Sequence, residues 1–256
     1  MISDPGATPF DLRFRLFGVD VRVHPFFWLV AVMLGWSSTR QPVFSENGLP
    51  ELLLWVVACF VSILLHEFGH IWMGQAFGSR GHILLHGMGG LAIGASAVDS
   101  PWKRILIVAA GPLIQLALWA GLRYGLIAFG PPMWLLEYPA LRVLLAFLIV
   151  INLYWPILNL LPVWPLDGGQ ITREASMLAA PRKGLLFSLW VSLVVAAVLA
   201  ANALIGERGE PFLPHYAPTG LWPGLLFGLF AFGSWQAIQA EQSRRYYERD
   251  ALPWER

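Results

Sequence analysis

Residues 66–70 of the chain read His66-Glu67-Phe68-Gly69-His70 and match the zinc-binding pattern H-E-x-x-H. On a helix, residues four apart lie on one face, so both imidazoles can bind one zinc ion while Glu67 comes round to the same side. A catalytic zinc takes three protein ligands and keeps one position for water, whose proton a nearby carboxylate can accept. The pattern also occurs by chance, but a glutamate between two histidines at the end of an apolar run is costly and usually functional. These residues therefore predict a hydrolytic metal site.

A third ligand has to come from another segment, and Asp167 is the strongest candidate. It follows Pro162 and Pro165 and precedes Gly168 and Gly169. The prolines end a helix, and the glycines permit a tight turn that can bring the carboxylate back into a helical bundle. Asp-Gly pairs are also common in ordinary surface turns, and taken by itself the segment fits that simpler interpretation.

The composition places these motifs in a membrane. Of the 256 residues, 57% are hydrophobic and 13% are charged, whereas soluble domains carry roughly 25% charged residues. The mean hydropathy is +0.59. The net charge of +1 gives no basic field of the kind that binds nucleic acid. We therefore expect a lipid-embedded protein with no nucleic-acid partner.

Six apolar segments are candidate membrane spans, and most approach the roughly 20 residues that cross a bilayer. They are residues 25–37, 50–77, 104–122, 140–161, 185–205 and 221–240. The first is short. If the N-terminus is cytoplasmic, only four of the 17 lysines and arginines fall outside, namely Arg40, Arg123, Arg142 and Arg208. The positive-inside bias predicts that both termini are cytoplasmic, and the compact size favours a prokaryotic cell membrane.

Two further stretches have strand-like or irregular patterns. Residues 12–24 alternate apolar and polar side chains about Gly18, which predicts a short hairpin on the cytoplasmic surface. Residues 82–98 are apolar but interrupted by glycines, which favours a re-entrant hairpin beside the metal site. The predicted fold class is an all-α membrane protein: a bundle of about six transmembrane helices with these two hairpins. We expect residues 1–256 to form one polytopic domain, with a catalytic core at about 12–170 and the last two spans and a polar tail at 171–256.

Taken together, the two motifs resemble the site-2 protease family of intramembrane zinc metalloproteases. That family pairs H-E-x-x-H with a later N-x-x-P-x-x-P-L-D-G-G segment, which here runs from Asn159 to Gly169 as NLLPVWPLDGG. Weaker similarities extend from about residue 12 to residue 170, in FRLFGVDVRVHPFFW, HGMGG and the AAGP of residues 109–112. The chain departs from the family at Gln115, where an asparagine is frequent.

The resemblance implies one zinc ion per chain, bound by His66, His70 and Asp167, with Glu67 as general base and acid. It also implies that Asn159 stabilises the oxyanion or holds the substrate backbone. The expected function is an intramembrane endopeptidase that cleaves in or near transmembrane segments of membrane proteins, in regulated proteolysis or in clearance of signal remnants. The lipid bilayer and a transmembrane protein substrate are the expected partners, and the oligomeric state is left open.

Several alternatives stay open at this point. The chain could be a metal-binding membrane protein or transporter without peptidase activity, although no repeat typical of transporters is visible. A zinc protease of another lineage would use a later glutamate as third ligand, for which Glu174 is the nearest candidate. Asn152 lies on the face of Asn159 and is at least as well explained by an interhelical hydrogen bond. His82 and His86 are four apart in a glycine-rich stretch, where hydrogen bonding is favoured over a second metal site.

Overall fold

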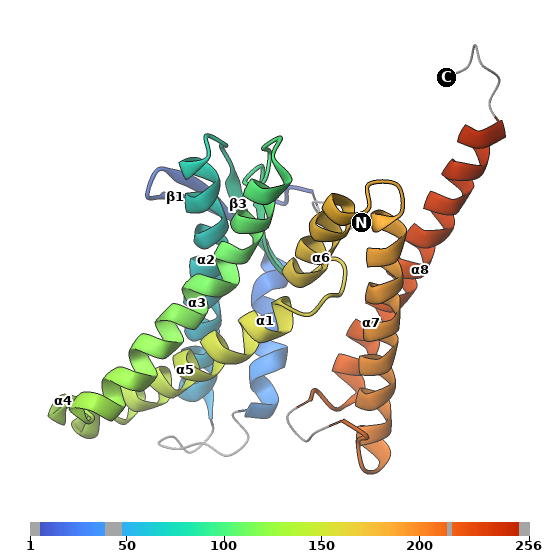
Figure 1. The fold of residues 1–256 in the computed structure, drawn as a ribbon. Helices are drawn as coiled ribbons and strands as arrows, with labels where there is room; N and C mark the ends of the chain where they lie inside the picture. Colours follow the sequence, from blue (N-terminus) through green and yellow to red (C-terminus); the bar gives the residue numbers. More distant parts are fainter. Residues whose placement is uncertain (1–5, 39–47, 214–216, 251–256) are drawn as a thin grey trace. The chain divides into compact units, whose positions relative to one another are not determined.

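A computed structural model describes residues 6–38, 48–213 and 217–250, and the chain in it is mostly helical with one small sheet (Figure 1). Arg40, which the charge count assigns to the outer side, lies outside the described residues. The chain forms two compact units. The N-terminal unit extends to Asn159, and the C-terminal unit starts at Leu160.

The N-terminal unit contains the sheet and most of the helices. Its elements are β1 Leu12–Leu16, β2 Val19–Val23, α1 Pro25–Ser38, α2 Leu49–Ala76, β3 His82–His86, β4 Gly89–Ile93, α3 Pro101–Phe129, α4 Met133–Glu137 and α5 Pro139–Asn159. The C-terminal unit contains α6 Asp167–Ala179, α7 Gly184–Arg208 and α8 Leu221–Asp250. Among the described residues, α2, α3, α5, α7 and α8 are long and apolar enough to cross a membrane. The apolar stretch Pro25–Trp36 of α1 is shorter.

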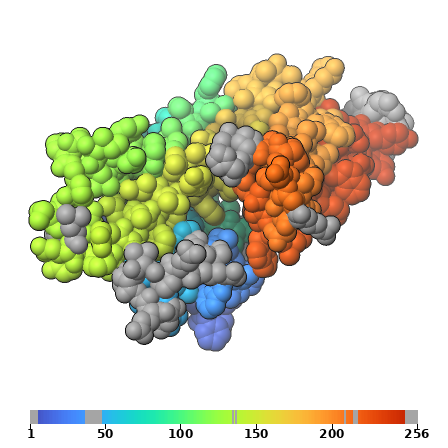
Figure 2. Space-filling model, turned by 90° about the horizontal axis from the view of Figure 1, so that it is seen from below, coloured from blue at the N-terminus to red at the C-terminus, as the bar shows by residue number. Residues whose placement is uncertain are grey.

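Apolar side chains cover the outward surfaces of these long helices. Leu113 and Ile127 of α3 and Tyr154 of α5 are all more than half exposed. Figure 2 shows α3 (green) and α5 (yellow-green), which contact each other, side by side at the surface. A large exposed apolar surface is expected where a helix faces lipid. The surface therefore agrees with the membrane class that the composition predicts.

The two predicted hairpins are both present as strands, and they belong to one four-stranded sheet in the order β1-β2-β3-β4. Within each hairpin the strands are antiparallel. The hairpins are joined by parallel pairing of β2 with β3, in which Val21 is opposite Ile83. The turn at Gly18, which has φ 79°, lies where the alternation predicts it. The sequence gives no sign of the parallel pairing, because it connects strands some sixty residues apart.

The sheet packs one face against the second half of α2. Val19, Val21 and Val23 of β2 are buried, whereas Asp20 is exposed, as the period of two requires. These valines share a core with Phe68 and Ile71 of α2 and with Ile83 and Leu85 of β3. Burial of such side chains stabilises the fold by roughly 1.5–3 kcal/mol each. The core therefore fixes the segment of α2 that carries the H-E-x-x-H motif.

Two glycines bring the neighbours of α2 unusually close. A Cβ atom at Gly69 would lie 2.6 Å from the carbonyl oxygen of Ala110 in α3, and one at Gly74 would lie 2.6 Å from the hydroxyl of Ser79. Real Cβ atoms do not tolerate such distances, so α3 can approach α2 only because residue 69 has no side chain. The close approach sets α3 directly beside His66 and His70.

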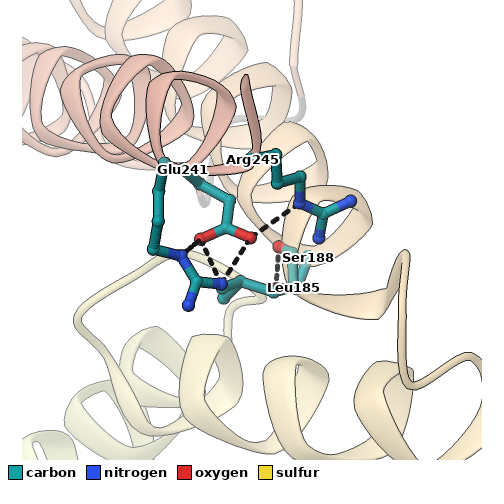
Figure 3. A network of polar contacts seen from close by, with 5 residues as sticks. Leu185, Ser188, Glu241 and Arg245 are labelled. Carbon is teal, nitrogen blue, oxygen red and sulfur yellow. Dashed lines mark hydrogen bonds and ion pairs between the residues drawn. The ribbon is translucent and has the colours of Figure 1, made fainter. Parts of the chain in front are cut away.

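The C-terminal unit differs from the sequence prediction at two places. First, α6 begins at Asp167, where we expected a turn, so Gly168 and Gly169 lie in the first turn of a helix. Second, α8 continues through residues 241–250, which we expected to be a polar tail. Glu241 binds Arg244 at 3.0 Å and Arg245 at 2.7 Å. Such pairs, three and four residues apart, support a helix (Figure 3). Residues 251–256 of the predicted tail lie outside the described residues.

Candidate metal centre

Three side chains on one face of α2 form the candidate metal centre. His66, Glu67 and His70 each offer a ligand atom, and these atoms all lie within 4.8 Å of one another. All three residues are buried. The two imidazole rings are 4.7 Å apart between centroids and nearly perpendicular. The cluster is the one that the H-E-x-x-H spacing predicts, and within the described ranges no other group of three histidine, cysteine or carboxylate side chains is so close.

Hydrogen bonds to the Nδ1 atoms set the tautomer of both histidines. His70 Nδ1 is 2.8 Å from the carbonyl oxygen of Ile107. A carbonyl oxygen only accepts, so this Nδ1 carries the proton. His66 Nδ1 is 2.8 Å from Oε1 of Gln115, whose Nε2 donates to the carbonyl oxygen of Ser62 at 3.0 Å. That second bond makes the oxygen the Gln115 atom that faces His66. In the neutral form of both rings Nε2 is then the nitrogen without a proton, the atom that can bind a metal.

Gly111 in α3 lies against the two imidazole rings. A Cβ atom at this position would collide with His70 Nε2 and would lie 2.9 Å from His66 Nε2. The backbone of α3 at Gly111 therefore lies in close contact with the His70 ring and near His66 Nε2, which only a residue without a side chain allows. Two imidazoles on one face of a helix, each oriented through its Nδ1, fit a zinc ion, which prefers His nitrogen at about 2.0–2.1 Å.

The carboxylate of Glu67 lies against the edge strand of the sheet. A side chain at Gly90 of β4 would collide with the carboxylate carbon and oxygen of Glu67. Glu67 therefore occupies the space between α2 and the backbone of β4. The sequence placed the 82–98 segment near the metal site, and this contact between Gly90 and Glu67 agrees with that expectation.

Gln115 stands where the resemblance leads us to expect an asparagine, and the structure shows which atoms it contacts. It is fully buried and connects His66 to the backbone of α2 at Ser62. The sequence signal for this role was weak: an amide three residues after Pro112, about one helical turn from Gly111. Sequence reasoning could not assign the contact, because nothing in α3 indicates which side of α2 it faces.

We predict that Gln115→Leu lowers the affinity for zinc about 10- to 100-fold, the usual effect of removing a hydrogen-bond partner of a metal-binding histidine. The reason is that His66 loses the acceptor that keeps its proton on Nδ1. Competition between the purified protein and a zinc chelator measures the change. Gln115→Glu keeps an acceptor oxygen and should bind zinc more tightly than Gln115→Leu. Equal affinities for Gln115→Leu and wild type would contradict the prediction.

The two asparagines of α5 have different surroundings. Asn152 is fully buried, and its Nδ2 donates to Ser62 Oγ and to the carbonyl oxygen of Leu148, both at 2.8 Å. The contact with Ser62 is the interhelical hydrogen bond considered above. Its buried Oδ1 has no hydrogen-bond partner among the described residues. Asn159 is the last residue of α5, and its Nδ2 donates to the carbonyl oxygen of Trp155 at 3.1 Å.

Asp167 lies in the C-terminal unit, where it is buried at the first turn of α6. Side chains at Gly168 and Gly169 would collide with the backbone of residues 160–161 and 163–164. The glycines are therefore required by close backbone contact, and not by the left-handed turn that the Asp-Gly sequence suggests. Glu174 follows on the same helix and is only partly buried.

His82 and His86 do not form a second site with each other. Both lie on β3, where residues four apart are separated by about 13 Å. His86 Nδ1 accepts a hydrogen bond from the backbone N–H of Met88 at 3.1 Å. The hydrogen-bonding interpretation of His86 is therefore supported, because a strand cannot bring these two rings to one ion.

Comparisons with known proteins agree with these motifs. A family model described as peptidase family M50 matches residues 135–201. A protein of Synechocystis sp. named as a zinc metalloprotease is 30% identical over 206 residues, which cover 74% of this chain and 52% of that protein. A zinc metalloprotease of Methanocaldococcus jannaschii is 30% identical over 165 residues, which cover 62% of this chain and 43% of that protein. The chain thus spans about half the length of these relatives.

One solved structure is similar to this chain over nearly the whole length of both proteins. The site-2 protease from Methanocaldococcus jannaschii matches with a TM-score of 0.53 and 26% identity, over 90% of this chain and 95% of that chain. The similarity therefore extends over most of the chain.

Proposed function

Because the chain is a member of peptidase family M50, the family of the site-2 proteases, we propose that it is an intramembrane zinc endopeptidase. Its substrates in this proposal are membrane proteins, cleaved at peptide bonds in or near their transmembrane segments. The observation that carries the proposal is the pair of buried imidazoles of His66 and His70, each oriented by a hydrogen bond at Nδ1, with Glu67 beside them.

The proposed ligands of the zinc ion are His66, His70 and Asp167. Two imidazole nitrogens and one carboxylate form a donor set typical of catalytic zinc, with a fourth position left for water. Asp167 is included because it is the aspartate of the PLDGG segment on which the resemblance rests, and it is buried at the start of α6. Zinc bound there supplies Lewis acidity, which makes water nucleophilic at neutral pH.

Glu67 has the chemistry of a general base and acid in this arrangement. Its carboxylate accepts a proton from the attacking water and delivers it to the amine that leaves. Its position between α2 and β4 places it beside the strand on which a substrate backbone can lie. Asn159 donates an amide hydrogen bond to the substrate backbone or to the oxyanion, for which it exchanges its present contact with Trp155.

A transmembrane substrate has to unwind before it can be cut, because a helix keeps its carbonyl groups hydrogen-bonded and shielded. The unwound segment then needs new hydrogen-bond partners. β4 is an edge strand of the sheet among the described residues, and its backbone lies against Glu67. Addition of the substrate to β4 as a further strand would satisfy these backbone groups. Substrates with helix-breaking residues are favoured for the same reason.

The membrane arrangement in this proposal has six spans, of which α1 is the shortest, and both termini are cytoplasmic. The five long apolar helices and the positive-inside bias support it. The β3–β4 hairpin is re-entrant, and the whole chain acts as one domain with a core at about residues 12–170. A prokaryotic cell membrane is the proposed location.

The test is cleavage of two model transmembrane substrates by the purified protein in detergent. One substrate carries a Gly-Pro pair in the middle of its span, and the other has Leu-Ala there. We expect the Gly-Pro substrate to be cut at least several-fold faster. Cleavage should stop with a zinc chelator and return when zinc is added. Zinc binding with no cleavage of either substrate would favour a metal-binding protein without peptidase activity. Equal rates would contradict the unwinding step alone.

A further inference from the structure

Two buried serines of the C-terminal unit contact the segment that leads to Asp167. The backbone N–H of Trp164 donates to Ser192 Oγ of α7 at 2.7 Å. Ser192 Oγ is in turn 2.7 Å from Ser234 Oγ of α8. The two serines are 1% and 0% exposed. The three groups form a continuous hydrogen-bonded chain from α8 through α7 to the loop.

These hydroxyls do not make the bonds that serines in apolar helices usually make. Such a serine normally bonds to a carbonyl of its own helix, three or four residues earlier. Ser188, one turn before Ser192 on α7, follows that rule and donates to Leu185 O at 2.8 Å (Figure 3). Ser192 instead accepts from a backbone N–H of another segment. Leaving a backbone N–H without a partner away from water is costly, so this contact holds the loop at Trp164.

The loop between Trp164 and Asp167 is compact, so a displacement of Trp164 also displaces Asp167. Leu166 N–H donates to Val163 O at 2.8 Å, and Gln170 N–H donates to Leu166 O at 3.0 Å. The missing side chains of Gly168 and Gly169 allow the first turn of α6 to lie against the backbone of residues 160–164. The guanidinium of Arg173 lies 5.5 Å from the ring centroid of Trp164, so α6 also contacts the side chain of that residue. Movement of Trp164 therefore moves the residue at the start of α6.

We propose that Ser192 and Ser234 are positioning residues for the metal centre: they fix the backbone at Trp164 and thereby the carboxylate of Asp167. The inference rests on the proposed function, because it takes Asp167 as a zinc ligand. Metal affinity depends on ligand placement within a few tenths of an ångström. The last two long helices of the chain thus contribute to zinc binding without providing a ligand.

The experiment measures zinc affinity by competition with a chelator, using the full chain in detergent. Ser192→Ala and Ser234→Ala should each lower the affinity about 10-fold, the lower end of the range for residues that orient metal ligands. Ser192→Thr keeps a hydroxyl and should retain most of the wild-type affinity for zinc. Ser188→Ala is the matched control. It removes a buried hydroxyl one turn away on α7, and the hydrogen bond described above for this hydroxyl stays within the helix. The Ser188→Ala variant should bind zinc as wild type does.

Repeating Ser192→Ala in an Asp167→Ala background shows whether the serine acts on zinc binding through Asp167 or through the stability of the whole protein. If the serine acts through Asp167, it has no further effect once that carboxylate is absent. An equal loss in both backgrounds would overturn the proposal, because the serine would then act on stability in general. Wild-type affinity of Ser192→Ala, with weak binding by Asp167→Ala, would overturn it while leaving the proposed ligands intact. Wild-type affinity of Asp167→Ala would overturn the ligand assignment and this inference with it.

Discussion

Glu67→Gln is expected to retain one zinc ion per chain and to lower the cleavage rate at least 100-fold. A glutamine has nearly the same size as a glutamate, so it fits the space between α2 and Gly90 without a new collision. Its amide cannot accept a proton from water or deliver one to the leaving amine. General acid–base catalysis contributes typically 10²–10⁴-fold to a rate, which sets the expected loss. Zinc content is measured by elemental analysis and cleavage with the Gly-Pro substrate.

Glu51→Gln provides the matched control for this variant. Glu51 is also a buried glutamate of α2, at 2% exposed, but it lies in the first turn of the helix. Sixteen residues of helix separate it from Glu67, a distance of about 24 Å. Its replacement changes the same chemical group far from the metal centre and should leave cleavage nearly unchanged. Cleavage at the wild-type rate by Glu67→Gln would show that another group transfers the proton.

The elements of the fold could be predicted wherever a local pattern specifies them. Apolar runs of sufficient length gave the long helices, and the alternation about Gly18 gave the β1–β2 hairpin. The start of α6 was missed because Asp-Gly-Gly has the composition of a turn. Only the close packing of Gly168 and Gly169 against the preceding backbone explains why these residues are helical.

The metal centre likewise could be predicted from the sequence only in part. His66, Glu67 and His70 lie together because the helical period alone brings them together. The parallel pairing of β2 with β3 and the contact of Gln115 with His66 depend on which surfaces of distant segments meet. A single sequence carries no local signal for such contacts, so the partners that set the histidine tautomers emerged only from the structure.

Gly111→Ala is expected to abolish zinc binding at micromolar zinc and to abolish cleavage with it. The added methyl group would collide with Nε2 and Cε1 of His70 and would lie 2.9 Å from His66 Nε2, so the ring would have to move. The rings cannot turn away at little cost, because each Nδ1 is held by a hydrogen bond, to Gln115 and to the carbonyl oxygen of Ile107. Zinc content after purification and chelator competition measure the loss. One zinc ion per chain in the variant would contradict the prediction that the two rings must keep their present positions to bind zinc.

Two opposing effects of this substitution on stability can be compared. Alanine is favoured over glycine inside a helix by roughly 0.5–1 kcal/mol. Overpacking a buried site costs typically 1–3 kcal/mol, so the metal-free variant should unfold at a lower denaturant concentration than metal-free wild type. Gly121→Ala isolates the first effect, because a side chain at Gly121 on the same helix has nothing within 4 Å. That variant should be slightly more stable than wild type and should bind zinc normally, since residue 121 lies about 15 Å along α3 from residue 111.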